Sequence, residues 1–393
     1  MEGLSRDSIT SIIDLPDDCL ILIFQWLDCN CDRESFGLTC RRWLNIQNLS
    51  RRSLQFQCSF TNFTQLIRSS LSQTSPTINS FHLHRLFTRF QYLQSLSLSG
   101  CTELLDLDLR QLQCCGSNLR TLFLDCCLGI TDRGLFLVGT FCPLLTVISL
   151  YRCNITDTGL ESLANACSAL KDVNLSYCAN ISDHGLKAVT QGCRQLQVVR
   201  ISSSSEVSGI GFKGCSSTLA YIEADCCKLE PEGIMGIASG GGLEYLNISG
   251  VSCSIKGGDL APIGTGFATS LKILNLRMCR AVGNESIMAI SKGCPLLQEW
   301  NLALCHGVTI TGWEAIAFNC HNLEKLHVNR CRNLCDDGLL ALRDGCSRLS
   351  VLYINGCRRI TTTAIELFKC YRSNVSIKGE EIMCIGPNLA SKQ

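Results

Sequence analysis

The 393-residue sequence predicts an α/β fold: a horseshoe-shaped solenoid with a parallel sheet inside and helices outside, preceded by a small all-α module. Two observations predict this architecture. A leucine-centred pattern recurs along most of the chain at a nearly constant step, which is typical of solenoids that grow by stacking repeats. A different apolar pattern, with helical spacing, occupies residues 14–50 before the repeats begin.

The composition narrows the class of protein. The net charge is +1, so no global field favours nucleic acid or an anionic membrane. Residues 1–13, which we expect to be a flexible amino terminus, lack the basic and apolar stretches of a secretory leader. The apolar run 19–24 is too short to cross a bilayer. We therefore expect a cytoplasmic or nuclear protein without nucleic-acid or membrane partners.

The module at residues 14–50 begins with a predicted helix. Pro16 suits its first turn, where the missing amide costs nothing. Its apolar stripe comprises Leu20, Ile23, Phe24 and Leu27. Asp32 can open a second helix, whose apolar members are Phe36, Leu38, Cys40 and Trp43. A module of this size has little core of its own, so the stripe is expected to contact another protein, the alternative being a helical cap on the first repeat.

The order of these residues resembles the F-box. The matching positions are Leu15, Pro16, Leu20, Ile23, Phe24, Leu27 and Trp43. In that family the segment binds the Skp-type adaptor of cullin-based ubiquitin ligases, so the resemblance implies that these residues build the F-box core or contact the adaptor. Arg41 and Arg42 have two open interpretations, as adaptor contacts or as solvated charges at a helix end.

Residues 51–92 are predicted to form degenerate first repeats that cap the solenoid, because an end repeat must shield the core. Within this cap, residues 54–58 and 81–84 are expected to be short strands. Regular repeats follow at residues 93–370. Their first positions are Leu93, Leu119, Leu145, Leu170, Leu196, Leu219, Leu243, Leu271, Leu297, Leu323 and Leu349.

Each repeat opens with apolar residues in the order of a half-buried strand, as in Leu119, Leu122 and Leu124. A cysteine follows three residues later in nine of the eleven copies, with Ser204 and Val251 as the exceptions. These are Cys101, Cys127, Cys153, Cys178, Cys227, Cys279, Cys305, Cys331 and Cys357. A thiol packs as a small hydrophobe with a weak donor, which suits the bend after a strand. The spacing resembles the cysteine-containing subtype of leucine-rich repeat from about Leu93 to Cys370.

A helix is predicted in the second half of each repeat. Thr131 and Asp132 can accept hydrogen bonds from its first free amides, and the carboxylate complements its dipole. A second cysteine marks the expected end of the helix, as at Cys142, Cys167, Cys193, Cys294, Cys320 and Cys346. Residues 371–393 are predicted to form a closing cap and a tail. Repeats five to seven break the rhythm with short steps and glycine-rich stretches.

The 29 cysteines are predicted to be reduced structural thiols, because their number is odd and no export signal accompanies them. No histidines converge on the cysteine ladder, so we expect no metal site and no cofactor. Motifs for nucleophilic catalysis or phosphate binding are missing from the sequence, so no catalytic residue is assigned.

The inner strands are predicted to bind a target protein. Aromatic and arginine side chains are the usual anchors of interfaces. The candidates are Tyr151, Arg152, Tyr177, Arg200, Arg277, His327, Arg330 and Tyr353, and Asn275 and Asn301 are also expected to face solvent. A basic strip near the strand ends, which either binds an acidic or phosphorylated segment or is a solvated edge, consists of Arg277, Arg280, Arg330, Arg332, Arg358 and Arg359.

The resemblance implies a non-catalytic role as the substrate-recognition subunit of an SCF (Skp–cullin–F-box) ubiquitin ligase. One end would bind the Skp-type adaptor, and through it the cullin, while the arc holds a protein destined for ubiquitination and proteasomal degradation. Such a protein works by proximity, because it raises the effective concentration of the target lysine. The alternative is a leucine-rich-repeat scaffold that acts without a degraded client.

Overall fold

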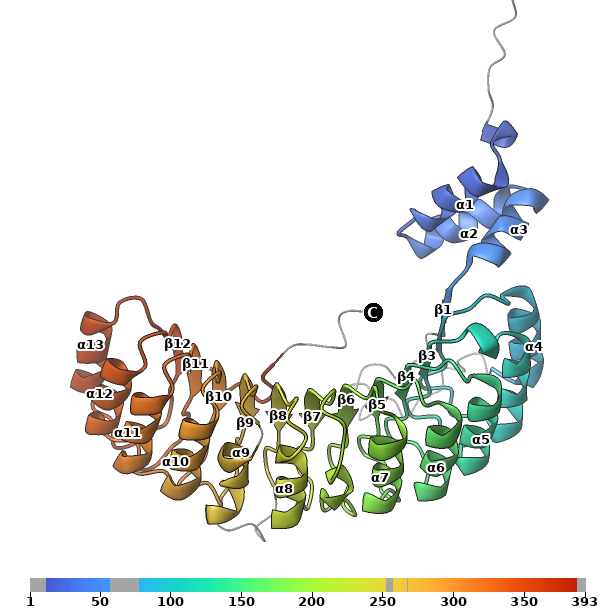
Figure 1. Ribbon diagram of the computed structural model, residues 1–393. Helices are drawn as coiled ribbons and strands as arrows, with labels where there is room; N and C mark the ends of the chain where they lie inside the picture. Colours follow the sequence, from blue (N-terminus) through green and yellow to red (C-terminus); the bar gives the residue numbers. More distant parts are fainter. Residues whose placement is uncertain (1–11, 57–77, 252–256, 267, 387–393) are drawn as a thin grey trace, which may run out of the picture.

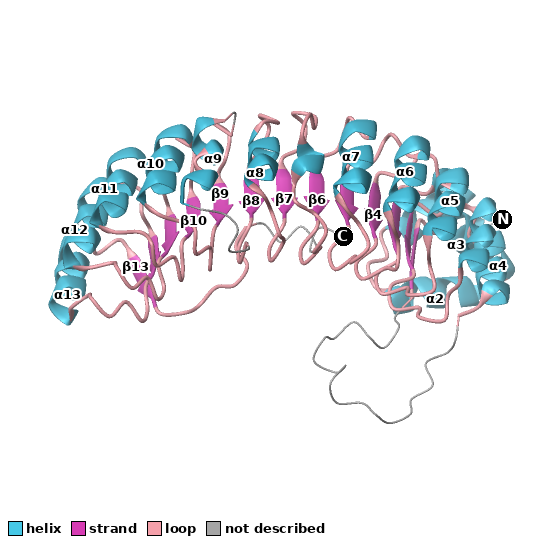
Figure 2. Cartoon of the chain, turned by 90° about the horizontal axis from the view of Figure 1, so that it is seen from below, coloured by secondary structure: helices cyan, strands magenta, loops and turns pink. Residues whose placement is uncertain are grey.

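The computed structural model describes residues 12–56, 78–251, 257–266 and 268–386. Within these residues the chain forms an arc with one continuous sheet inside and helices outside, and a small helical module stands at one end (Figure 1). Seen from below, the helices line the convex side along its whole length (Figure 2). The predicted horseshoe solenoid with an all-α amino-terminal module is confirmed.

The described residues form a sheet of 13 parallel strands that follow each other in sequence order. The strands are β1 (Ser53–Gln55), β2 (Ser95–Ser97), β3 (Thr121–Phe123), β4 (Val147–Ser149), β5 (Asp172–Asn174), β6 (Val198–Arg200), β7 (Tyr221–Glu223), β8 (Tyr245–Asn247), β9 (Ile273–Asn275), β10 (Glu299–Asn301), β11 (Lys325–His327), β12 (Val351–Tyr353) and β13 (Ser376–Lys378). Strands β2 to β12 carry the predicted repeats, and β1 and β13 extend the sheet at either end.

The α-helices of the module are α1 (Asp17–Gln25), α2 (Asn30–Thr39) and α3 (Arg41–Ser50), after a 3-10 turn η1 (Ile12–Asp14). Those of the arc are α4 (Ser80–Arg89), α5 (Asp132–Phe141), α6 (Asp157–Ala166), α7 (Asp183–Gly192), α8 (Pro231–Ala238), α9 (Pro262–Thr265), α10 (Asn284–Gly293), α11 (Ile310–Asn319), α12 (Asp336–Gly345) and α13 (Thr362–Tyr371). Irregular repeats use the 3-10 helices η2 (Asp106–Cys114), η3 (Gly116–Asn118), η4 (Ile210–Phe212) and η5 (Gly257–Leu260).

One strand prediction in the cap was wrong. Residues 81–84 lie in helix α4, which Asn79 caps by accepting a hydrogen bond from the amide of His82 at 3.2 Å. Leu83 and Phe87, four residues apart, are buried on one face of α4, which is helical rather than strand spacing. The prediction of a strand at residues 54–58 holds for β1, whereas residues 57 and 58 lie outside the described residues.

The cysteine ladder links neighbouring repeats. Eight of the nine ladder thiols donate to the carbonyl at the end of the preceding repeat's strand region, as from Cys153 Sγ to Leu124 O at 3.1 Å and from Cys305 Sγ to Leu276 O at 3.1 Å. Ser204, which replaces a cysteine, donates to Leu175 O at 3.4 Å. The serine exception therefore keeps the ladder's hydrogen bond.

The second set of cysteines lies where the helices end. Cys142, Cys167 and Cys193 are the C-cap residues of α5, α6 and α7, and later repeats repeat the arrangement. The thiol of Cys167 donates to Cys142 O at 3.3 Å, one repeat earlier. Burial raises the pKa of these thiols, so they remain protonated donors in the core.

The turn after each strand is left-handed at one position. The residue immediately before the ladder position has a positive φ in all eleven repeats, a count taken within the described residues. Three of these residues are glycines, and the others are Cys126, Arg152, Tyr177, Ser203, Cys226, Met278, Leu304 and Arg330. This backbone conformation was not predicted, and it sets the direction in which these side chains leave the concave edge.

Candidate functional site

The helical module has a core of its own, separate from that of the arc. Leu20, Phe24, Phe36 and Ile46 are buried together. The Phe36 ring packs at 5.3 Å from the Phe24 centroid and stacks at 4.3 Å on Trp43. Aromatic packing of this kind supplies much of the apolar contact that so small a module can make.

The single helix expected after Asp32 is two helices. Cys40, with φ −161° and ψ 170°, is extended and separates α2 from α3. This break turns α3 back onto α1, where Arg42 donates from Nη2 to Leu15 O at 2.6 Å and pairs with Asp17 at 2.6 Å. Leu38 and Cys40 are therefore exposed, and they do not continue the predicted apolar face.

The predicted adaptor-binding residues divide into three groups. Leu20 and Phe24 are buried in the module core and support its surface from beneath. Pro16 is exposed at the start of α1. The half-buried members of the set are Leu15, Ile23, Leu27 and Trp43.

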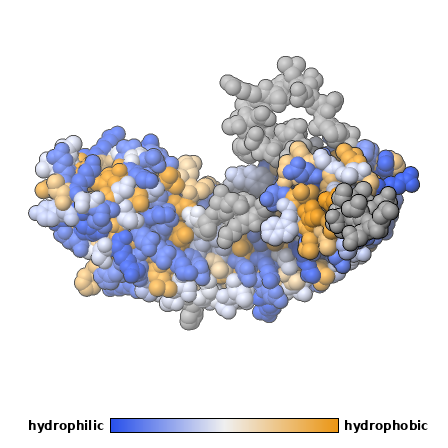
Figure 3. All heavy atoms as spheres, turned by 90° about the horizontal axis from the view of Figure 1, so that it is seen from above, coloured by the Kyte–Doolittle hydropathy of each residue, from blue (hydrophilic) through white to orange (hydrophobic). Residues whose placement is uncertain are grey.

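The most exposed apolar side chains of the module were not among the predicted adaptor-binding residues. Trp26 is 82% exposed, Leu38 85% and Leu22 55%. For Leu22 the signal lay in α1, where five consecutive apolar residues from Leu20 to Phe24 exceed what one buried face can hold. Seen from above, apolar surface is visible at this end of the molecule and also at the opposite end (Figure 3).

The joint between module and arc includes polar and cation–π contacts. Arg89 of α4 donates from Nε to Asn48 Oδ1 of α3 at 2.6 Å, and the Arg51 guanidinium lies 5.2 Å from the Phe90 ring centroid. The module's exposed apolar residues are thus not used to seal it against the arc. They form a surface suited to a protein partner.

The amino-terminal half of the concave face brings three predicted target-binding residues together. The rings of Tyr151 and Tyr177 meet edge to face at 5.2 Å between centroids. Arg152 follows Tyr151 and is exposed. Arg152 and Tyr177 both leave the chain at left-handed turn positions. Aromatic and arginine side chains in one patch match the composition of interface anchors.

The centre of the concave face is acidic around one cation. Arg200 pairs with Asp172 at 2.6 Å and contacts Glu223 at 3.5 Å. Burial raises the pKa of both carboxyl groups, and the guanidinium opposes that rise. Tyr221 donates to Glu223 Oε1 at 2.6 Å and stacks at 3.9 Å on Tyr245. Arg200 is thereby committed to an internal network.

In the carboxyl-terminal half, the expectation of solvent exposure was wrong for three residues. His327, Asn275 and Asn301 are each at most 1% exposed. His327 stacks on Tyr353 at 4.2 Å, and its Nε2 lies 2.9 Å from Glu299 Oε1. The two asparagines are covered because the carboxyl-terminal segment of the chain crosses this part of the sheet.

The imidazole contact also affects the ionisation of Glu299. Burial alone would raise its pKa, but the hydrogen bond with His327 and the charge of Lys325 together lower it below its ordinary value. Glu299 is therefore a carboxylate at neutral pH and is engaged with its neighbours on β11.

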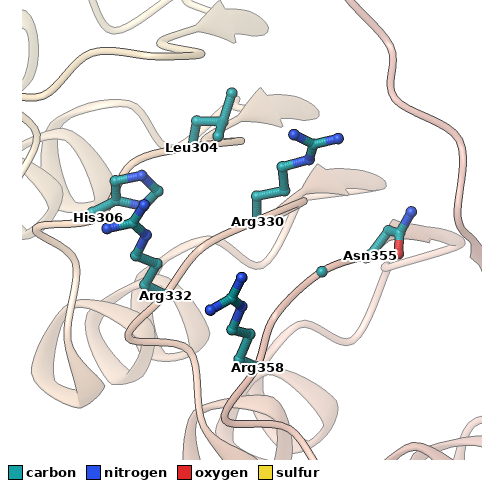
Figure 4. Close-up of a pocket in the computed structure, with 7 residues that line it drawn as sticks. Leu304, His306, Arg330, Arg332, Asn355 and Arg358 are labelled. Atoms are coloured by element: carbon teal, nitrogen blue, oxygen red, sulfur yellow. The ribbon is translucent and has the colours of Figure 1, made fainter.

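Half of the predicted basic strip converges. Arg330, Arg332 and Arg358 line one pocket together with His306 and Leu304 (Figure 4). Burial and the charges of Arg332 and Arg280 lower the pKa of His306, so its imidazole is neutral at pH 7. Arg277 and Arg359 do not line this pocket. The arrangement presents guanidinium groups to an anion.

The described residues hold no group of three or more histidine, cysteine or acidic side chains placed to bind a metal ion. Within the same part of the chain, no helix has the length and apolarity needed to span a bilayer.

Comparison with protein families matches residues 12–55 to the F-box domain. Residues 141–164, 166–189 and 267–291 match the leucine-rich repeat. The chain is 71% identical over 379 residues to F-box/LRR-repeat protein 12 of Arabidopsis thaliana, covering 96% of this chain and 95% of that protein. It is 27% identical to F-box/LRR-repeat protein 4 of Bos taurus over 36% of this chain and 28% of that protein.

Among solved structures, the fold is similar to that of an internalin from Listeria monocytogenes. The TM-score is 0.54 at 16% identity, and the match covers 77% of this chain and 83% of the internalin. At this identity the similarity concerns the solenoid fold alone.

Proposed function

Because the chain belongs to the F-box/LRR-repeat proteins, we propose that it is the substrate-recognition subunit of an SCF ubiquitin ligase. The helical module binds the Skp-type adaptor, and the adaptor connects the chain to the cullin. The concave face of the arc binds a target protein for ubiquitination and proteasomal degradation. The chain itself takes no part in the chemistry and acts in the cytoplasm, the nucleus or both.

One observation carries this proposal. The module buries its own core and leaves Leu22, Trp26 and Leu38 exposed. Exposed aromatic and leucine side chains on so small a unit have an unfavourable hydration free energy that a partner surface would remove. A cap that served only to close the solenoid would bury these residues against β1 and α4.

The target-binding part of the proposal assigns two anchor patches. Tyr151, Arg152 and Tyr177 form one patch. Arg277 and Arg330 belong to the other, where the half-buried Tyr353 stacks on the buried His327. Arg200 supports the face between them through its ion pairs.

The decisive experiment is an adaptor pull-down with the full chain and with Trp26→Ala and Leu38→Ala combined. We expect the double variant to lose adaptor binding while the arc keeps its melting temperature. Phe318→Ala is the matched control, because Phe318 is an equally exposed aromatic (78%) on the convex helix α11.

Retention of adaptor binding by the Trp26 and Leu38 variant would contradict the assigned surface. Failure of the unaltered chain to bind any Skp-type adaptor would instead favour the scaffold function, in which the arc binds proteins without delivering them to a ligase.

A further inference from the structure

After strand β13 the chain turns back and crosses the concave face of the sheet. Residues 379–386 run from the last strands towards the middle of the arc (Figures 1 and 2). This segment passes over β12, β11, β10 and β9 and reaches β8, in the reverse of the strand order. A cap that only closed the solenoid would end at β13.

The sheet holds this segment through side chains that donate to its backbone carbonyl groups. Asn355 donates to Gly379 O at 3.2 Å, and the next strand's Asn329 donates to Glu380 O at 2.8 Å. The remaining contacts, one per strand, run from Asn301 to Ile382 O at 3.4 Å, from Asn275 to Met383 O at 3.4 Å and from Tyr245 to Ile385 O at 2.9 Å. We call these five donor residues the amide track.

The spacing of these contacts is that of an extended peptide. Six residues separate Gly379 from Ile385, and in extended conformation they span about 20 Å. Four strand spacings separate β12 from β8, which is about 19 Å. The match of the two lengths lets a largely extended chain, with bends at Met383 and Gly386, meet one donor on or just after each strand.

Two of the track asparagines are held in place before any peptide binds them. Asn275 accepts a hydrogen bond at Oδ1 from the amide of Arg277 at 3.1 Å, and Asn301 accepts one from the amide of Ala303 at 3.0 Å. These turns after the strand orient each Nδ2 group towards the concave side. A donor fixed in this way loses little side-chain entropy on binding.

Only a few contacts depend on the side chains of the segment. Glu381 pairs with Arg330 at 2.6 Å, Ile385 is buried, and Gly386 has a φ of +104°. A Cβ atom on Gly386 would lie 2.1 Å from the Tyr245 ring, so this position admits glycine alone without a shift. The backbone contacts therefore accept any extended segment, and the side-chain contacts select an acidic residue followed four residues later by an aliphatic one.

The basic pocket adjoins the acidic position. Arg330 belongs both to the ion pair with Glu381 and to the pocket wall, beside Arg332 and Arg358 (Figure 4). Neither Arg332 nor Arg358 has an ion-pair partner among the described residues. One glutamate therefore engages one of three arginines, whereas a group with more charge and more oxygen atoms can engage several.

We propose that the amide track and the basic pocket form the binding site for an extended acidic segment of a target protein, and that residues 379–386 are the chain's own occupant of that site. This inference rests on the proposed role of the concave face in target binding. A target that carries a phosphate, or adjacent carboxylates, at the Arg330 position displaces the occupant because it engages Arg332 and Arg358 as well.

The occupant acts as a tethered competitor. A short tether holds it at an effective concentration on the order of millimolar, so a weak peptide from solution competes poorly with it. The Arg330–Glu381 pair is partly exposed and contributes little, which keeps the occupant displaceable. A segment that fits less well than the occupant is thus excluded from the site.

The test measures binding of a fluorescein-labelled peptide with the sequence of residues 379–386, carrying Cys384→Ser, to the full-length chain by anisotropy. In the chain, Gly386→Val expels the occupant by collision with Tyr245. We expect it to raise the affinity for the peptide at least about tenfold. The matched control is Gly379→Val, since a Cβ on Gly379 meets nothing within 4 Å. The exposed change Glu381→Gln removes only the partly exposed pair with Arg330, so it should raise the affinity by a smaller factor, with little risk to folding.

The charge contact is tested in the Gly386→Val background. Adding Arg330→Glu should weaken binding at least about tenfold, and a peptide carrying Glu381→Lys should recover most of that loss. A peptide with phosphoserine in place of Glu381 should bind tighter than the parent peptide, and the combined change of Arg332→Ala and Arg358→Ala should remove that advantage. Equal binding of the two peptides would overturn the role of Arg332 and Arg358.

The proposal as a whole is overturned if neither Gly386→Val nor Glu381→Gln raises peptide binding, or if Arg330→Glu leaves it unchanged. These results are independent of the adaptor. The Trp26 and Leu38 variant should bind the peptide as the parent chain does. If the peptide experiments fail, the proposed ligase function is unaffected. If adaptor binding fails, the proposed peptide site is unaffected.

Discussion

At the scale of single residues, the ladder cysteines combine two properties in one side chain. A thiol fills the tight space after the strand as a small apolar group, and it also donates to a carbonyl of the preceding repeat. Burial raises the pKa of Cys305 well above its ordinary value, so the donor is always protonated at physiological pH. The ladder position therefore favours cysteine. Where serine replaces it at Ser204, the hydroxyl makes the same hydrogen bond to the preceding repeat.

This dual role predicts a ranking of substitutions at Cys305. Cys305→Ala removes the donor and leaves a small cavity, and we expect a loss of about 1–2 kcal/mol in the free energy of unfolding. Cys305→Ser should cost less, because its hydroxyl can donate to Leu276 O as Ser204 donates to Leu175 O. Chemical denaturation of both variants checks the ranking, and a serine variant less stable than the alanine variant would contradict it.

Arg200 gives a prediction that depends on pH. Arg200→Met leaves Asp172 and Glu223 without their cation in a partly buried site, and we expect a loss of about 3 kcal/mol near neutral pH. Burial raises the pKa of both carboxyl groups, and removal of Arg200 raises them further. A carboxyl group with a raised folded-state pKa lowers stability as pH rises from its unfolded-state pKa to its folded-state pKa, because over that interval only the unfolded group has ionised.

The stability deficit of Arg200→Met should therefore shrink as the solution is acidified from neutral towards the ordinary carboxyl range. Thermal melting of the variant and the parent chain across that range measures it. Arg200→Lys, which keeps the charge, should show a smaller deficit with weaker pH dependence. A deficit that stays constant with pH would rule out the ionic explanation.

At the scale of elements, neighbouring repeats are joined by aspartates that the sequence pattern predicted to cap their own helices. The carboxylate that begins α5, α6, α7 and α12 reaches the next repeat, as Asp157 accepts from Ser182 N at 2.8 Å and from Ser182 Oγ at 2.5 Å. Glycine is required beside it, because a Cβ on Gly185 would lie 2.5 Å from Asp157 Oδ1. The aspartate thus connects two helices rather than capping one.

Asp157→Ala should lower the free energy of unfolding by about 2 kcal/mol, since it removes two charge-assisted hydrogen bonds. Asp157→Asn should cost about half as much, because Asn284 makes the equivalent contact natively, accepting from Thr309 N at 2.9 Å. The shift of the denaturation midpoint compares the two. If Asp157→Ala and Asp157→Asn lowered the free energy of unfolding equally, an acceptor oxygen at this position would not by itself stabilise the contact, and the prediction would be wrong.

At the scale of the whole molecule, two cores share one chain. The arc has a continuous core from α4 to β13, whereas the module has its small cluster around Phe24. Stability in a solenoid passes from repeat to repeat through neighbouring contacts, and the module lies outside that series. Each part should therefore respond separately to damage.

Phe24→Ala should unfold the module and spare the arc. Truncation of a buried phenylalanine costs about 3–5 kcal/mol, which a core of this size cannot absorb. Limited proteolysis should then cut within residues 14–50, while the main thermal transition of the arc stays where it was. Trp26→Ala, at an exposed position two residues further along the chain, should show neither effect. Joint unfolding of both parts would contradict two separate cores.

The sequence by itself determined the features that repeat or that depend on near neighbours. The strands β2 to β12, the helix ends at Cys142 and Cys167, and the thiol ladder all follow from a local pattern seen many times. Such features are predictable because each repeat buries its apolar side against its neighbours in the same way. The apolar order of the F-box segment likewise identified its core residues Leu20 and Phe24.

Only the tertiary structure decided which predicted surface is open. His327, Asn275 and Asn301 have the alternation of solvent-facing residues, yet all three are buried. A distant segment crosses the two asparagines, and His327 stacks on Tyr353 and contacts Glu299. The contact between Tyr245 and Ile385 joins residues 140 positions apart and occurs once, so it leaves no period in the sequence. The physical reason is that local patterning fixes which face of a strand a side chain takes, whereas its exposure depends on everything else that packs on that face.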